Sequence, residues 1–302
     1  MNRYRLSYLQ QLESESIHIL REVAAEFRNP VMLYSIGKDS SVMVRLAMKA
    51  FHPAPFPFPL MHVDTGYKFP EMIAFRDRFC EEMGARLLVE RNEEWIAKGC
   101  HPLKIGVDPC CSHLKTGALL QAIAKHGFDA AIGGARREEE KSRAKERIFS
   151  LRDPFGQWDP KNQRPEVWDL YNMRINEGET VRVFPLSNWT EEDIWQYIKL
   201  EGIPVVPIYF AMERQIIRRK GILIPLSSCS LPDDEAAETE TVLCRFRSLG
   251  CIPCTGAVAS PATTLDGIIA EVAAARKSER ENRVIDLTGD ASMELKKKEG
   301  YF

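Results

Sequence analysis

The chain alternates between two spacings of apolar residues. Residues 6–28 carry apolar side chains three to five positions apart, close to the period of a helix. Short apolar runs of strand length follow at residues 31–34, 60–63, 86–89, 130–134 and 181–186. Between these runs, helical spacing returns at residues 42–51, 71–83 and 114–126. Strands that alternate with helices in this way predict an α/β fold, in which a parallel sheet is covered by helices on both faces.

The second half of the chain has a weaker pattern. Residues 150–180 are rich in Trp, Pro, Asn and Arg, which predicts an ordered but irregular excursion. A helix is expected at 191–197, where acidic residues fill the favourable first turn behind the capping residue Thr190. We also expect a mobile loop at 226–241 and a helix at 264–279 that precedes a polar tail.

Composition narrows the class of protein. The 302 residues are 44% hydrophobic and 28% charged, as in an ordinary globular protein with a buried core. A net charge of −2 gives no global basic field of the kind that attracts nucleic acid. No stretch approaches the ~18 apolar residues of a membrane helix, and the N-terminus does not resemble a secretory signal. We therefore expect a cytoplasmic protein without a membrane partner.

The first predicted strand leads into a polar loop just before a helix, Ser35-Ile36-Gly37-Lys38-Asp39-Ser40-Ser41. Parallel sheets bind ligands at the carboxyl ends of their strands. Gly37 allows close approach of an anion to the backbone, and the helix start offers free N–H groups. Ser35, Ser40 and Ser41 add hydroxyl donors, and Lys38 adds charge. A simple capped turn is the alternative, but a cap needs neither Lys38 nor Asp39. The loop lacks the spacing of the nucleoside-triphosphatase P-loop, so we predict a phosphate loop of another type.

Two later segments offer further nucleotide contacts. Asp64 follows the second predicted strand and is suited to ribose or Mg²⁺, although a strand-ending turn is the alternative. Behind Gly133-Gly134 lies a cationic segment with Arg136, Arg137, Lys141, Arg143, Lys145 and Arg147. Its intervening acids also fit a solvated helix with internal ion pairs. Because the segment starts at the sheet edge, we favour anion binding: Mg²⁺, Lys and Arg stabilise the charge that develops when an α-phosphate is attacked.

These motifs resemble the N-type ATP pyrophosphatases, which adenylate a substrate and release pyrophosphate. More closely, the chain is similar to the small, ATP-binding subunit of bacterial sulfate adenylyltransferase. The matching stretches are 12–19, 30–41, 62–69, 133–137, 141–147, 158–165, 183–190 and 292–296. The resemblance implies an adenine-nucleotide-alpha-hydrolase-like domain over residues 1–200. It also implies an irregular C-terminal extension over 201–302, which carries the Cys-x-x-Cys pair and a partner-binding tail.

The same resemblance, together with the residue chemistry, assigns the nucleotide site. ATP and Mg²⁺ are the expected ligands. We predict that Lys38, Asp39, Arg136 and Arg137 are catalytic. The predicted nucleotide-binding residues are Ser35, Gly37, Ser40, Ser41, Asp64, Gly134 and Arg143.

Four of the eight cysteines depart from that resemblance. In a reducing compartment cysteines favour metal binding or sulfur chemistry over disulfides. The chain has Cys110-Cys111 where the family has a His-containing segment, and Cys251-Ile252-Pro253-Cys254 where the family has one cysteine. The pattern resembles the [4Fe–4S] signature of adenylylsulfate reductases and implies that Cys110, Cys111, Cys251 and Cys254 bind a cluster. Zinc and chance burial are the alternatives. Cys80, Cys100, Cys229 and Cys244 are interpreted as structural.

The combination of a phosphate loop with four thiolates suggests thiolation chemistry. The leading hypothesis is an ATP pyrophosphatase that adenylates an oxyanion in sulfur metabolism, by analogy DNA backbone phosphate for phosphorothioation. A cysteine desulfurase or another sulfur donor would then be a partner, and DNA the substrate. The second hypothesis is a sulfate adenylyltransferase small subunit with a GTPase partner. The third is a non-catalytic iron–sulfur scaffold, although the intact loop argues against it. A homo-oligomer is compatible with all three.

Overall fold

A six-stranded sheet forms the centre of the protein. The computed structural model describes residues 6–219, 221–226, 239–275 and 297–300. The strands are β1 (Pro30–Leu33), β2 (Leu60–Val63), β3 (Leu87–Glu90), β4 (Ala130–Ile132), β5 (Phe149–Arg152) and β6 (Thr180–Val183). Their order is β3-β2-β1-β4-β6-β5, and all neighbours are parallel except the edge strand β5 against β6. The chain order reverses between β1 and β4, which opens a crevice at their carboxyl ends.

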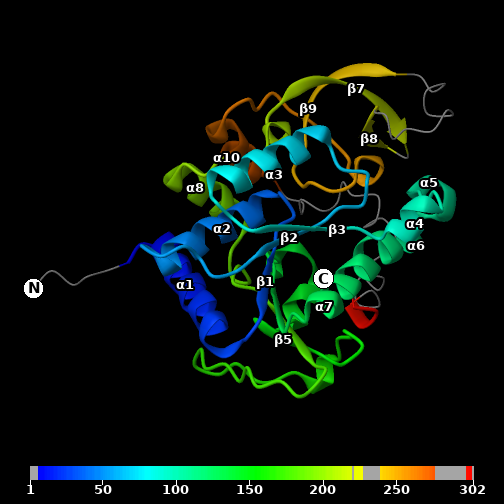
Figure 1. The fold of residues 1–302 in the computed structure, drawn as a ribbon. Helices are drawn as coiled ribbons and strands as arrows, with labels where there is room; N and C mark the ends of the chain where they lie inside the picture. The colour runs from blue at the N-terminus through cyan, green and yellow to red at the C-terminus, as the bar shows by residue number, and fades with distance from the viewer. Residues whose placement is uncertain (1–5, 220, 227–238, 276–296, 301–302) are drawn as a thin grey trace, which may run out of the picture.

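Helices cover both faces of this sheet, as Figure 1 shows. The helices α1 (Tyr8–Glu26), α2 (Lys38–Phe51), α3 (Pro70–Glu82) and α8 (Glu191–Glu201) share one large apolar core with the sheet. On the opposite face α7 (Ala118–His126) packs Leu119 and Ile123 against a smaller core. Capping boxes fix the starts of α1 and α8. The predicted parallel sheet with helices on both faces is confirmed.

Three short helices connect β3 to α7. They are α4 (Glu93–Ala97), α5 (Pro102–Ile105) and α6 (Val107–Cys111). One π-helical turn, Ser112–Gly117, joins α6 to α7, so the helix predicted at 114–126 begins inside this turn. π-turns inside helices often accompany functional sites.

The region predicted to be an irregular extension contains a second sheet. Strands β7 (Met212–Arg219), β8 (Ile222–Pro225), β9 (Glu240–Arg245) and β10 (Val258–Ala259) are antiparallel in the order β10-β9-β7-β8. Helix α10 (Leu265–Ala274) packs against α8. The stretch predicted as irregular at 150–180 also contains most of β5. A domain boundary near residue 200 stays a prediction.

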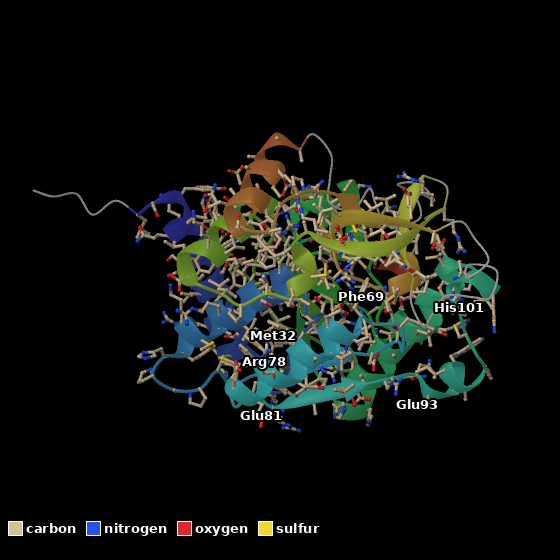
Figure 2. The ribbon with its side chains drawn as sticks, turned by 90° about the horizontal axis from the view of Figure 1, so that it is seen from above. Met32, Phe69, Arg78, Glu81, Glu93 and His101 are labelled. Atoms are coloured by element: carbon tan, nitrogen blue, oxygen red, sulfur yellow. The ribbon has the colours of Figure 1, made fainter. Side chains whose placement is uncertain are left out.

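Several predictions fall wholly or partly outside the described residues. These are most of the loop at 226–241, Cys229, the end of the helix at 264–279, and the tail stretch 292–296. Within the described ranges, no helix is both long and apolar enough to span a bilayer. In the view from above, Glu81 of α3 lies near the edge of the molecule (Figure 2), while Met32 and Phe69 are buried.

Candidate functional site

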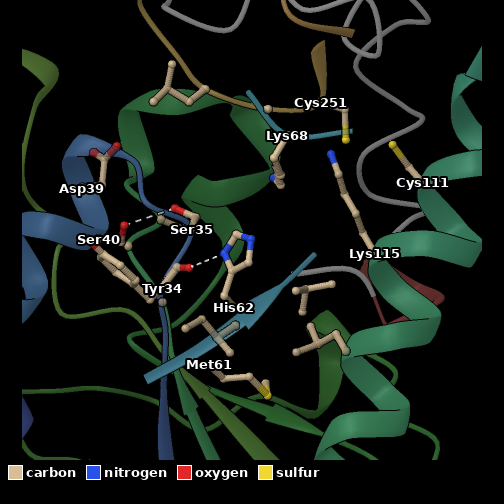
Figure 3. A pocket seen from close by; sticks show the side chains of 18 of the residues that line it. Tyr34, Ser35, Asp39, Ser40, Met61, His62, Lys68, Cys111, Lys115 and Cys251 are labelled. Carbon is tan, nitrogen blue, oxygen red and sulfur yellow. Dashed lines mark hydrogen bonds between the residues drawn. The ribbon is translucent and has the colours of Figure 1, made fainter. Parts of the chain in front are cut away.

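A cavity of about 270 Å³ opens where β1, β2 and β4 end (Figure 3). Its lining residues come from five segments, within 33–40, 61–68, 111–119, 133–143 and 249–255. The first four belong to the parallel sheet and its connections, and the fifth follows β9 of the second sheet. The cavity therefore occupies the crevice that the strand order predicts.

The predicted phosphate loop forms one wall of this cavity. Ile36 is fully buried and has a left-handed backbone with φ of 67°, which is unfavourable for a β-branched residue. This turn places Gly37 as the N-cap of α2. The hydroxyls of Ser40 and Ser41 donate to the Gly37 carbonyl at 2.9 and 3.2 Å. From outside the loop, Tyr209 Oη accepts the Lys38 N–H at 2.8 Å. Hydrogen bonds within the loop and one bond to Tyr209 thus fix the conformation of the loop.

A carboxylate links the loop to the cationic segment. Asp39 Oδ2 lies 3.2 Å from Lys38 Nζ, and Asp39 Oδ1 accepts from Arg136 Nε at 2.7 Å. Lys38 and Arg136 are each 1% exposed, so both cations are held inside the protein. Gly134 allows the close approach, because a Cβ there would lie 3.1 Å from Asp39 Cβ. Arg136 also pairs with Glu138 at 3.0 Å, so the two cations beside the loop are held in a network of carboxylates.

Arg143 reaches the cavity from a buried ionic network. Its guanidinium lies 3.2 Å from Glu146 and 3.4 Å from Glu140. Glu146 also pairs with Arg152 at 2.7 Å and with Lys297 at 3.1 Å. Burial opposes the charged form of Glu146, but Arg143, Arg152 and Lys297 outweigh it and lower its pKa to about 2. Glu140 and Glu146 therefore partly neutralise the positive charge of Arg143.

Six of the eleven predicted nucleotide-site residues lie outside the cavity lining: Gly37, Lys38, Ser41, Asp64, Arg136 and Arg137. Arg137 donates a hydrogen bond to Asn188 Oδ1 instead. Asp64 lies 3.5 Å from Arg91 and accepts the Gly66 N–H at 2.9 Å. Their predicted roles, catalysis for Arg137 and ribose or Mg²⁺ binding for Asp64, remain predictions.

The four predicted ligand cysteines come together. Cys110 and Cys111 end α6, and Cys251 and Cys254 flank a turn in which the Cys254 N–H donates to the Cys251 carbonyl at 2.9 Å. All four line one small void next to the cavity. Cys111, Cys251 and Cys254 also line the cavity itself. In Figure 3 the Lys115 side chain extends towards Cys251. Segments 140 positions apart thus meet at the wall of the candidate nucleotide site.

These thiols differ in how readily they ionise. Burial disfavours the Cys251 thiolate, but Lys115, Lys68 and a 3.2 Å contact with the Thr65 hydroxyl outweigh it and lower its pKa. Burial raises the pKa of Cys254 to about 12 and raises the pKa of Cys110 further above its ordinary value. Among the described residues, no three Cys, His, Asp or Glu side chains are grouped closely enough to hold one metal ion.

The other described cysteines lie apart from this void or behind it. Cys80 and Cys244 are buried elsewhere, and the Cys100 thiol hydrogen-bonds with Cys110. Sequence reasoning missed His62, Lys68, Lys115 and Tyr209 as site residues. His62 carried a signal, since a polar residue inside a buried apolar strand needs a partner. Tyr209 carried none.

Known proteins resemble this chain over its full length. The family described as the phosphoadenosine phosphosulfate reductase domain matches residues 29–257. Sulfate adenylyltransferase subunit 2 of Parabacteroides distasonis is 60% identical over 302 residues and 100% of both chains. The protein of the same name from Saccharophagus degradans is 59% identical over the same length and coverage. A solved phosphoadenylyl-sulfate reductase from Candida auris is 16% identical, with a TM-score of 0.47, over 68% of this chain and 93% of that chain.

The phosphate-loop cavity and the full-length relatives together define an ATP-using adenylyltransferase of sulfur metabolism. The chain belongs to the phosphoadenosine phosphosulfate reductase domain family, in the group of proteins named sulfate adenylyltransferase subunit 2. The predicted resemblance is confirmed.

Proposed function

We propose that this protein transfers the adenylyl group of ATP to sulfate. A sulfate oxygen attacks the α-phosphorus, the bond from that phosphorus to the bridging oxygen of the β-phosphate breaks, and pyrophosphate leaves. The observation that carries the proposal is the pair of cations, Lys38 and Arg136, fixed by Asp39 against the phosphate loop. Relatives named for sulfate adenylyl transfer, at about 60% identity over the full chain, support sulfate over DNA phosphate as the acceptor.

The proposal assigns a role to the residues in and around the cavity. The loop hydroxyls and the start of α2 bind the phosphates, and Lys38 and Arg136 stabilise the charge that grows on the departing pyrophosphate. Lys68 and Arg143 also line the cavity and give a dianionic acceptor a favourable field. The lining carboxylates Asp39 and Glu139 are hard oxygen ligands that suit Mg²⁺, which would neutralise phosphate charge when bound with ATP.

The proposal includes a partner, because the relatives are named as one subunit of an enzyme. The GTPase subunit expected from the sequence is the partner to test. With that subunit, GTP and ATP, we expect pyrophosphate release to depend on sulfate and to stop when chloride replaces sulfate. Release that ignores sulfate but requires DNA and a cysteine desulfurase would instead select the phosphorothioation hypothesis.

We further propose that Cys110, Cys111, Cys251 and Cys254 hold a [4Fe–4S] cluster. All four line one void, and four cysteine thiolates are a complete ligand set for such a cluster. Zinc bound by the same four thiolates is the alternative that metal analysis must separate from the cluster. When bound, the cluster would tie the segment at 110–111 to the turn at 251–254.

Metal analysis tests the cluster directly. Protein purified without oxygen should contain iron and acid-labile sulfide and show the visible absorbance of iron–thiolate charge transfer. Cys110→Ser and Cys254→Ser should lose most of the iron. Cys80→Ser and Cys244→Ser, which change buried thiols outside the void, should keep it. Stoichiometric zinc without iron, or equal iron in all four variants, would contradict the proposal.

A further inference from the structure

A buried histidine points into the cavity from β2. His62 is 1% exposed and lines the cavity, and Figure 3 shows its ring at the centre of the view, beside Ser35. Its Nδ1 lies 2.9 Å from the Tyr34 carbonyl oxygen. A carbonyl oxygen can only accept, so Nδ1 carries the proton. This contact fixes both the orientation and the tautomer of the ring.

The other ring nitrogen is a buried acceptor. Within the described part of the chain, Nε2 has no hydrogen-bond partner. Burial, and after it the charge of Lys68, lowers the pKa of His62 to about 3, so the ring is neutral near pH 7. A neutral ring protonated at Nδ1 offers only a lone pair at Nε2. Buried polar atoms of this kind nearly always have a partner, and here the cavity is where a partner can sit.

The chemistry of the partner follows from the acceptor. Phosphate and sulfate oxygens are deprotonated at neutral pH and offer no hydrogen to Nε2. In ATP the groups that donate are the exocyclic amino group of adenine and the ribose hydroxyls. The phosphates already have a binding surface at the loop, where the Ser35 and Ser40 hydroxyls lie 3.3 Å apart.

We propose that His62 Nε2 accepts a hydrogen bond from the nucleoside part of ATP and makes His62 a specificity-determining residue. The inference rests on the proposed binding of ATP in this cavity. If the donor is the adenine amino group, ITP and GTP are rejected because they carry a carbonyl at that position, which sets two acceptors against each other. A buried acceptor left unpaired is a strong basis for such discrimination.

Equilibrium binding to the full chain tests this inference with four nucleotides: ATP, ITP, 2′-deoxy-ATP and 3′-deoxy-ATP. The wild-type protein should bind ATP about 10-fold to 100-fold more tightly than the analogue that lacks the donor, from the cost of an unpaired buried acceptor. In His62→Leu that preference should disappear, mainly through weaker binding of ATP. His62→Gln keeps an acceptor and should retain part of the preference. The matched control His18→Leu changes a half-exposed histidine on α1 and should bind all four nucleotides as the wild type does.

The possible results distinguish the proposed role of His62 from the proposed binding of ATP in this cavity. Loss of the preference over ITP identifies the amino group, and loss of the preference over a deoxy analogue identifies that hydroxyl. A His62→Leu protein that binds all four nucleotides more weakly by one common factor overturns the inference, since this is what a purely structural role produces. A wild-type protein that binds ATP and the three analogues equally also overturns it and leaves the proposed function standing. A wild-type protein that binds no ATP overturns both.

Discussion

Asp39→Ala is expected to slow ATP cleavage by about 100-fold to 1000-fold, the scale seen when one group that organises transition-state charge is removed. Asp39 holds Lys38 and Arg136 on its two carboxylate oxygens. Without it, the two buried cations lose the carboxylate that holds them together beside the phosphate loop. Since the defect concerns charge that grows during the reaction, kcat should fall more than the affinity for ATP.

Pyrophosphate release and ATP binding, measured separately, check this expectation. Asp266→Ala is the matched control, because it removes an exposed carboxylate that pairs with Lys199 on the surface. That control should keep the wild-type rate. An Asp39→Ala protein that turns over like the wild type would remove the catalytic role assigned to this residue.

Glu146→Gln should lower the free energy of unfolding by about 3–5 kcal/mol. This is the usual cost of removing one partner of a buried ion pair. Glu146 is 4% exposed and pairs with Arg143, Arg152 and Lys297. Glutamine keeps the shape but removes the carboxylate that pairs with Arg152 and leaves Arg143 and Lys297 to share Glu140. Denaturant unfolding at neutral pH measures the effect. Glu94→Gln, which changes an exposed residue paired with Lys98, is the control and should unfold as the wild type does.

The same carboxylate predicts a pH dependence. The folded protein holds the pKa of Glu146 at about 2, against an ordinary value of 4.5. Between these values the unfolded chain binds more protons than the folded one, so acid favours unfolding. The contribution of Glu146 is complete above about pH 4.5 and is lost as the pH falls towards 2. The stability difference between wild type and Glu146→Gln should therefore be constant near neutral pH and shrink in acid. A difference that grows in acid would contradict this account.

The sequence predicts the parallel sheet well and the second sheet poorly, for a physical reason. Strands buried on both faces read as continuous apolar runs, as at Ala130–Ile132. β7 instead reads Met-Glu-Arg-Gln-Ile-Ile-Arg-Arg, and its mixed burial gives no apolar run. β5 is fully buried yet contains Ser150 and Arg152, because Glu146 pairs with that arginine inside the protein. A strand that contains a charged residue paired inside the protein cannot be predicted from an apolar pattern.

Some residues of the candidate site could be predicted from the local sequence, and others depend on the fold. Residues next to each other in the chain, such as the loop at 35–41, were identified because local spacing carries their chemistry. The contact between Lys38 and Tyr209 spans 171 positions and depends on how two parts of the fold dock. The neighbours Arg136 and Arg137 look alike in sequence, but Arg136 has an extended backbone, which sends successive side chains to opposite sides. Only one of them can reach Asp39.

The five-segment cavity wall has a consequence for how the protein assembles. Its lining residues run from Leu33 to Thr255, so it is complete only after contacts between very distant parts of the chain have formed. Such contacts form slowly, because long loops must close before they are made. ATP can recognise only the finished arrangement, and a ligand that binds only the native state stabilises it in proportion to its concentration. ATP bound in this cavity as proposed would therefore stabilise the docking of the segment at 249–255 against the edge of the sheet.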